Sequence, residues 1–154
     1  MRASNKTVIG RAALVRFFDL PEHWVPAKID TGADLSSIWA TDIHVQSDGC
    51  LTFKLFGPSS KYFSGTQIVV PSADFRLAHI ENSFGVGEKR YVVKLRVQVE
   101  GRLFKATFTL ADRSVKTYPV LLGRRLLNGK FIVDVSLGKS LHAATLPSKR
   151  GIES

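Results

Sequence analysis

The sequence predicts an all-β closed barrel with one short helix near its C-terminal end. Roughly eight to ten short runs of β-branched and aromatic residues are separated by turn residues, and only residues 123–128 can hold one or two helical turns. No heptads or internal repeats interrupt this pattern. A chain of 154 residues is expected to form a single domain, with its core at about 7–136 and a flexible basic tail at 147–154.

The first part of the chain is predicted to consist of strands joined by short turns. The strands are expected at residues 7–20 (as 7–9 and then 12–18), 24–29, 36–45 and 50–56. The turn between the first two is expected at residues 19–22, because Pro21 cannot donate a ladder hydrogen bond. In the last of these strands Leu51, Phe53 and Leu55 alternate with other residues, which is typical of one buried face.

The second part contains the clearest hairpin of the sequence. Strand character is weak at residues 66–70 and 75–79, and a glycine-containing loop is expected at 81–89. Residues 91–99 then alternate, Glu100 and Gly101 turn the chain, and the apolar face continues over 104–110. The remaining predicted elements are a strand that starts after Pro119, a helical turn within 123–128 and a last strand at 131–135.

One acidic turn has the residues for hydrolytic chemistry. The strand that ends at Ile29 runs into Asp30, Thr31 and Gly32, and the glycine allows a sharp turn. Such a turn would hold the Asp30 carboxylate out of the sheet, where a rigid carboxylate can activate water without a metal. The alternative is an ordinary capping or turn carboxylate between two strands.

A second segment, residues 118–127, supports the functional interpretation of the Asp30 turn. Together, AKIDTGADLSSIWA, NSFGVGEKRYVV, FTLADRS and YPVLLGRRLLNGKFIVDVS resemble the retropepsin-like aspartic proteases. The pattern is most similar to their bacterial RimB-type branch, which is often labelled "ATP-dependent zinc protease" and is associated with the glutamate ligase RimK. The resemblance extends from about Val8 to about Val135. It implies a closed acid-protease barrel in which each chain supplies one catalytic aspartate, and therefore a homodimer.

The resemblance also assigns roles around the turn. Asp30 would be the catalytic carboxylate, Thr31 would hydrogen-bond across the dimer, and Gly32 would let the substrate backbone approach. The structural support would come from Ala33, Asp34, Gly123 and Arg124. In that family the helix arginine, here Arg124, braces the acidic residue after the turn, here Asp34. The alternative is a surface ion pair, which is worth less than about 1 kcal/mol.

A further group of residues is expected to bind substrate. A mobile hairpin over residues 82–90 is the candidate flap, which would close over substrate and exclude water. Its residues and the cations expected beside it are Ser83, Gly85, Gly87, Arg90, Tyr91, Arg76 and Arg113. By resemblance, the arginines would form a cationic groove for a poly-acidic substrate, because guanidinium groups bind carboxylates in a bidentate manner. The alternative is ordinary solvated charge at a sheet edge.

Composition limits the partners and the compartment. The net charge of +9 and a pI near 10.0 favour an anionic partner, although a solubilising surface would give the same values. Cys50 is the only cysteine, so we expect a reducing compartment. Without an apolar leader or a run of bilayer length, a cytoplasmic location with no membrane partner is expected.

No cofactor or metal is expected. His23, His44, His79 and His142 are scattered, no H-E-x-x-H motif is present, and glycine–lysine spacing for ATP is missing. Trp39 occupies the place of a histidine found in many bacterial relatives, and we expect it in the core.

The sequence thus predicts a homodimeric aspartic endopeptidase, with trimming of poly-glutamate tails on a ribosomal protein as the activity that the resemblance implies. The first alternative is a non-catalytic basic module that docks on ribosome, RNA or acidic peptides. The second is a metal-dependent hydrolase. Nucleic acid is not expected as a partner, because basic and aromatic residues do not interleave regularly along the chain.

Overall fold

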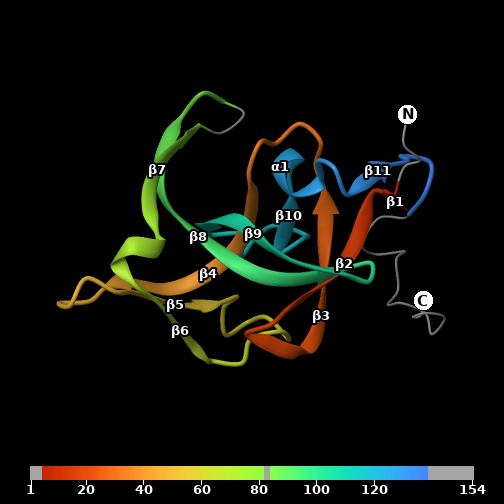
Figure 1. Cartoon of the computed structure of the whole chain (residues 1–154). Helices are drawn as coiled ribbons and strands as arrows, with labels where there is room; N and C mark the ends of the chain where they lie inside the picture. The colour runs from red at the N-terminus through yellow and green to blue at the C-terminus, as the bar shows by residue number, and fades with distance from the viewer. Residues whose placement is uncertain (1–4, 82–83, 139–154) are drawn as a thin grey trace.

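The computed structural model describes residues 5–81 and 84–138, and the fold is all-β with one short α-helix, as the sequence predicts (Figure 1). The predicted tail at 147–154 lies outside the described residues. The elements are β1 (Thr7–Ile9), β2 (Ala12–Phe17), β3 (Leu20–Ile29), β4 (Ser36–Val45), β5 (Leu51–Leu55), β6 (Gln67–Val70), the 3-10 turn η1 (Ser72–Asp74), β7 (Arg76–Glu81), β8 (Gly87–Val99), β9 (Arg102–Ala111), β10 (Val120–Leu122), α1 (Arg124–Leu127) and β11 (Phe131–Val133).

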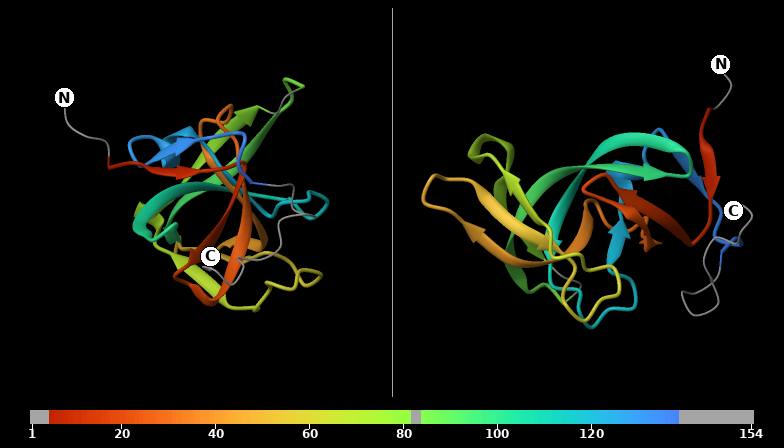
Figure 2. Two further views of the ribbon diagram at one scale, coloured as in Figure 1. Left: turned by 90° about the vertical axis from the view of Figure 1, so that its right-hand side faces the viewer. Right: turned by 90° about the horizontal axis from the view of Figure 1, so that it is seen from below.

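The main sheet closes on itself. Its strand order is β10-β3-β2-β8-β9-β4-β5-β6, and β10 pairs with β4 as well as with β3. This second pairing completes a ring from β10 through β3, β2, β8, β9 and β4, so the predicted closed barrel is confirmed. β5 and β6 extend the sheet from β4, while β7 adds to β8. They lie at the opposite end of the molecule from the small β1–β11 sheet (Figures 1 and 2).

The β8–β9 hairpin forms the largest part of the barrel wall. Glu100 and Gly101 both have positive φ, of 50° and 80°, which gives the tight two-residue turn whose twist suits a hairpin. The alternation expected of the two strands is confirmed. The side chains that face the core are Val93, Leu95, Val97, Val99, Ala106, Phe108 and Leu110. Trp39 is also buried, as expected, with its ring close to Gly57.

The two runs predicted within the first strand form two separate strands in the structure. β1 ends at Ile9 and β2 begins at Ala12, because Gly10 passes so close to Leu137 that a Cβ there would lie 2.6 Å from the Leu137 carbonyl oxygen. β1 then pairs in parallel with β11 rather than with β2. The expected turn at residues 19–22 is shorter as well. β3 already begins at Leu20, whose pairing with Phe17 leaves Pro21 inside the strand, beside an irregular register.

The predicted loop at residues 81–89 is shorter in the structure, because β7 ends at Glu81 and β8 already begins at Gly87. β7 and β8 pair in antiparallel register as far as Glu81 and Gly87, so cross-strand pairing overrides the weak local strand propensity of this segment. Gly85 has a φ of 80° at the tip, where glycine is favoured. Ser83 lies outside the described residues.

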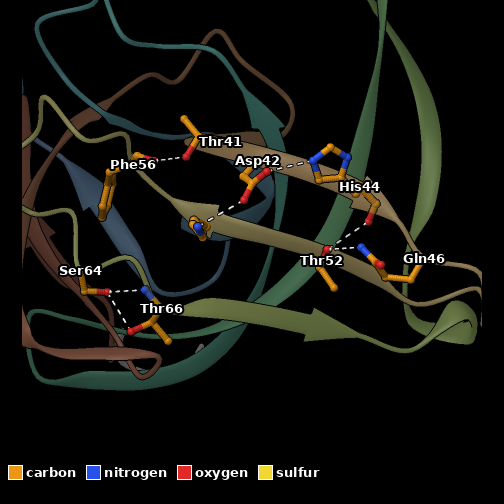
Figure 3. Close-up of polar contacts among 9 residues, drawn as sticks. Thr41, Asp42, His44, Gln46, Thr52, Phe56, Ser64 and Thr66 are labelled. Atoms are coloured by element: carbon orange, nitrogen blue, oxygen red, sulfur yellow. Dashed lines mark hydrogen bonds and ion pairs between the residues drawn. The ribbon is translucent and has the colours of Figure 1, made fainter.

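The far end of β4 carries a polar cluster of its own (Figure 3). The Asp42 carboxylate lies 2.9 Å from His44 Nε2 and 3.2 Å from Lys54 Nζ. The hydrogen bond from His44, followed by that from Lys54, holds the pKa of Asp42 below its ordinary value. His44 is therefore occupied by a local ion pair on β4, away from the Asp30 turn.

None of the helices in the described part of the chain has the length and apolar character needed to span a bilayer.

Candidate functional site

The Asp30 turn is fixed by backbone hydrogen bonds. The Asp30 amide donates to the Leu122 carbonyl oxygen at 2.9 Å, and the Ala33 amide donates to the Asp30 carbonyl oxygen at 3.2 Å. The Gly32 amide donates to Asp30 Oδ1 at 3.0 Å, which leaves the second carboxylate oxygen available for chemistry. Thr31 and Gly32 are exposed and Asp30 is half-buried. The turn therefore presents an oriented carboxylate at the surface.

The second sequence segment lies directly against this turn. β10 is inserted between β3 and β4, the two strands that the Asp30 turn connects. The Arg124 amide at the start of α1 donates to the Ala33 carbonyl oxygen at 2.7 Å. A Cβ on Gly123 would lie 2.7 Å from the Leu35 carbonyl oxygen and 2.8 Å from that of Ala33. Only glycine lets the two backbones approach this closely, which gives Gly123 a physical role in bracing the turn.

The predicted Asp34–Arg124 ion pair is present at the turn, and Arg125 is a second and closer partner of Asp34. The Asp34 carboxylate lies 3.8 Å from Arg124 Nη2, but Arg125 contacts both of its oxygens, with Nε–Oδ1 at 3.2 Å and Nη2–Oδ2 at 3.1 Å. Arg124 instead donates through Nη1 to the Thr31 carbonyl oxygen at 3.2 Å. All three side chains are about half exposed in the single chain, so there the pair has the character of the surface ion pair that the sequence left open.

Buried hydroxyl groups form the next layer beneath the turn. Ser36 Oγ accepts a hydrogen bond from the Gly123 amide at 3.0 Å. Ser37 Oγ and Thr109 Oγ1 lie 2.9 Å apart, and Arg90 Nη1 lies 3.5 Å from each of them. The layer thus joins β4, β9 and β10 below Asp30 to the base of the β7–β8 hairpin.

Two arginines from distant segments stand near Asp30. The Arg90 side chain is only 20% exposed, and its Nε donates to Glu88 Oε2 at 2.5 Å. Arg113 is half-buried, and its Nε donates to the Tyr118 carbonyl oxygen at 3.0 Å. Burial lowers the pKa of the Arg113 guanidinium, the Arg90 charge lowers it further, and the Asp30 charge opposes both effects. This mutual influence places Arg90, Arg113 and Asp30 in one electrostatic cluster.

The other predicted substrate-binding residues lie elsewhere. Tyr91 packs edge-on against Phe75, with ring centroids 5.7 Å apart, and it contacts the core rather than the Arg90 side of β8. Arg76 is exposed at the start of β7 and lines a groove against β6, β8 and β9. Gly87 lies against the His79 ring on β7, and Gly85 forms the hairpin tip. Of the predicted cations, Arg113 is thus the one influenced by the charges of both Arg90 and Asp30, whereas Tyr91 and Arg76 lie elsewhere.

A surface depression lies beside the Asp30 turn. It has a volume of about 550 Å³, and its lining includes Thr31, Arg124, Asn128 and Phe131. Because Thr31 is exposed at its rim, a second molecule placed here would reach the backbone next to Asp30.

No metal-ligating cluster was found among residues 5–81 and 84–138, where no group of three or more His, Cys, Asp or Glu side chains is placed to hold an ion. The chemistry that the described residues can perform is that of a carboxylate oriented by backbone amides and flanked by guanidinium groups. Such a group can accept a proton from water or hold one against a carbonyl oxygen.

Sequence reasoning missed part of this site. Ser36, Ser37 and Thr109 were not singled out, although two serines in a strand that continues as a buried apolar run are a detectable signal for buried hydrogen bonding. Arg125 was missed because Arg124 and Arg125 are adjacent and only the direction of α1 decides which of them reaches Asp34.

Comparison with known proteins agrees with this geometry. The family model described as "Retropepsin-like aspartic endopeptidase RimB" matches residues 8–142. Proteins named "Probable alpha-L-glutamate ligase" from Shewanella pealeana and Shewanella halifaxensis are each 30% identical over 137 residues, which is 87% of this chain. A protein of the same name from Desulfotalea psychrophila is 28% identical over 86% of this chain. The matched region is only 30% of the two Shewanella proteins and 29% of the third.

The fold is also shared with a solved structure. A Legionella pneumophila protein of unknown function superimposes with a TM-score of 0.66 at 24% identity, over 87% of this chain and 96% of that one. This likeness concerns the fold alone. The family match covers most of the chain and includes the Asp30 turn, β10 and α1. The chain therefore belongs to the RimB-like family of retropepsin-like proteins.

Proposed function

We propose that the chain is a homodimeric aspartic endopeptidase whose Asp30 carboxylate pairs with that of a second copy. The observation that carries the proposal is the Asp30 turn itself. The turn lies against the end of β10, is held by backbone amides and is exposed at Thr31. A fold that rigidly orients one carboxylate at a surface suits a reaction in which a second identical group completes the site.

The paired carboxylates would act as acid and base. Two like charges about 3 Å apart repel by roughly 5 kcal/mol at an effective dielectric of about 20, so the pair holds one proton. The ionised Asp30 would take a proton from the water between them, and the protonated Asp30 would donate a hydrogen bond to the scissile carbonyl oxygen. Water then adds to the carbonyl carbon, and proton transfer to the leaving nitrogen accompanies cleavage of the C–N bond.

Two surfaces support a dimer. The depression beside Thr31 gives a partner access to the backbone of the catalytic turn. The two-stranded β1–β11 sheet exposes Val8 at 52% and Ile132 at 47% of their area, and each strand pairs only with the other among the described residues (Figure 2). A partner that adds strands to this sheet would cover these side chains and satisfy the free edges.

The substrate side is cationic. Arg113 is influenced by the charges of both Asp30 and Arg90, and a guanidinium can bind a carboxylate through two hydrogen bonds. We propose an acidic peptide as the substrate, with glutamate tails on a ribosomal protein as its physiological form. Support comes from the relatives, in which a region similar to this chain occurs within longer proteins named as glutamate ligases.

The β7–β8 hairpin is proposed as the flap. It rises at the same end of the molecule as the turn between β3 and β4 (Figure 1). Arg90 at its base connects it to the hydroxyl layer beneath Asp30. Movement of this hairpin about the Arg90 contacts would close its tip over a bound peptide and exclude water.

The proposal is tested with a glutamate-rich peptide and mass-resolved products. Wild type should cleave it, a pepstatin-like inhibitor should block cleavage, and a chelator should leave it unchanged. Asp30→Asn should abolish activity while the dimer persists. Asp42→Asn makes the same chemical change on an exposed carboxylate of β4 and should retain activity. A fully active Asp30→Asn protein would end the proposal, and binding without cleavage by wild type would favour the non-catalytic module.

A further inference from the structure

One face of the barrel wall carries cations from three strands. The basic face comprises Arg16, Lys94, Arg96 and Lys105, together with the aromatic residues Phe18 and Trp24. Arg96 lies directly opposite Lys105 in the β8–β9 ladder, and Lys94 is on the same face two residues away. Arg16 is opposite Gln98 on the neighbouring pair and donates to its Oε1 at 2.5 Å. The cations thus form a continuous row across β2, β8 and β9.

This row carries positive charge that the carboxylates of residues 5–81 and 84–138 do not neutralise. In the described part of the chain, none of the cations of the basic face forms an ion pair with a carboxylate. Like charges directly opposite each other in a ladder are destabilising, so the Arg96–Lys105 pair weakens the free sheet. An anion bound between them would remove that repulsion, which points to an anionic ligand.

The aromatic residues of the basic face distinguish among anions. Trp24 is 38% exposed with the Arg16 guanidinium 5.2 Å from its ring centroid, and Phe18 is 41% exposed with Arg96 at 6.0 Å. Each guanidinium is thereby held beside an aromatic surface. Bases of single-stranded nucleic acid stack on both kinds of surface while cations contact the phosphates, whereas a carboxylate-rich peptide needs only the cations.

A groove continues the basic face at its other end. Its volume is about 540 Å³, and it shares Lys94 and Lys105 with the row. Arg76 and Thr107 add polar groups, and Val69 and Phe75 add apolar surface, while Asp19 and Asp74 also line it. The combination of a cationic edge with an apolar floor can receive a base beside its phosphate.

We propose that the basic face binds single-stranded RNA. The proposal departs from the expectation drawn from the chain order, in which basic and aromatic residues do not interleave. Here the interleaving arises across strands, because pairing brings Arg16 and Trp24 beside Phe18 and Arg96. Six residues of extended strand separate Trp24 from Asp30, or about 20 Å, so RNA held at Trp24 and Phe18 would lie away from the Asp30 turn, whereas the groove end of the face reaches Arg125. The proposal is independent of peptidase activity.

The test is fluorescence anisotropy with a labelled oligouridine of about 12 nucleotides, between about 50 and 200 mM salt. The charge variant is Arg96→Gln/Lys105→Gln. Its matched control is Lys89→Gln/Lys116→Gln, which removes two exposed cations outside the basic face. The stacking variants are Phe18→Leu and Trp24→Leu, each alone, so that one remains informative if the other fails to fold in a thermal melt.

The charge variant should weaken binding about tenfold and reduce the salt slope by about 1.4, while the control changes affinity less than about threefold. A stacking variant should weaken binding several-fold to about tenfold without changing the slope. Equal losses in the charge variant and its control would overturn the proposal, because net charge alone would then explain binding. Equal affinity for a glutamate-rich peptide, with no effect of the stacking variants, would also overturn it and identify an acidic-protein surface.

Discussion

The amide of Gly123 donates a hydrogen bond to Ser36 Oγ at 3.0 Å in the buried layer beneath the Asp30 turn. Gly123 belongs to the second sequence motif, and Ser36 begins the strand that follows the first. The two motifs are thus joined by buried contacts between β4 and the start of α1, where water cannot compete. This attachment holds the Asp30 turn more firmly than the exposed Asp34 ion pairs can.

Loss of the Ser36 hydroxyl tests this attachment. Ser36→Ala leaves the Gly123 amide buried without its acceptor, so the free energy of unfolding should fall by about 1–3 kcal/mol. Ser64→Ala is the control, because that hydroxyl makes its contacts with Thr66 at an exposed position. Urea denaturation of both variants measures the difference. Equal, small losses would show that the buried bond does not hold the turn.

Arg124 and Arg125 form a matched pair for the dimer. Arg124 donates to the Thr31 carbonyl oxygen within the catalytic turn, whereas Arg125 contacts Asp34 alone. Arg124→Ala should therefore weaken dimerisation and activity together, while Arg125→Ala should change the stability of the single chain by less than about 1 kcal/mol. Sedimentation equilibrium and peptide cleavage measure the two effects. A fully stable dimer in Arg124→Ala would refute the brace.

Arg113 should set substrate affinity. Arg113→Gln removes a half-buried cation near Asp30, so KM for a glutamate-rich peptide should rise about tenfold, the loss expected for one charge-assisted hydrogen bond. Arg76→Gln is the control, since Arg76 lies in the groove beside β6 instead. Comparing KM for acidic and neutral peptides measures the contribution of Arg113 to the binding of an acidic substrate. If both variants shift KM alike, bulk charge attracts the substrate.

The Asp42 cluster should make stability depend on acid pH. Its hydrogen bonds with His44 and Lys54 hold the pKa of Asp42 below 3.8 in the folded chain. The stabilisation is therefore present above about pH 4 and is lost as the pH falls through the lower folded value. The Tm difference between wild type and Asp42→Asn should shrink between pH 5 and about pH 3. A difference that stays constant over this range would contradict the assignment.

Much of the fold could be predicted because local patterns agree with the tertiary structure. The alternation in β8 and β9, the Glu100–Gly101 turn and the strand start after Pro119 depend on neighbouring residues. The errors occurred where long-range contacts decide. β3 already begins at Leu20 because Leu20 pairs with Phe17, and residues 87–90 become strand because β7 pairs with them.

The candidate site could likewise be predicted only in part. Asp30 and Gly123 could be identified from their motifs, because their roles depend on backbone conformation and close approach. The closer contact of Arg125 with Asp34 and the position of Tyr91 could not, since each is decided by the direction in which a side chain leaves its helix or strand. The basic face could not be predicted from the order of residues along the chain, because it forms only when β2, β8 and β9 are paired.

Subunit mixing tests the shared dyad most directly. Wild type and Asp30→Asn are unfolded together in equal amounts, refolded to exchange subunits, and assayed on the glutamate-rich peptide at constant total protein. If each active site needs one Asp30 from each copy, only the wild-type dimers cleave, and activity should fall to about one quarter of that of pure wild type. Activity of about one half would mean that each chain works alone and would contradict the account.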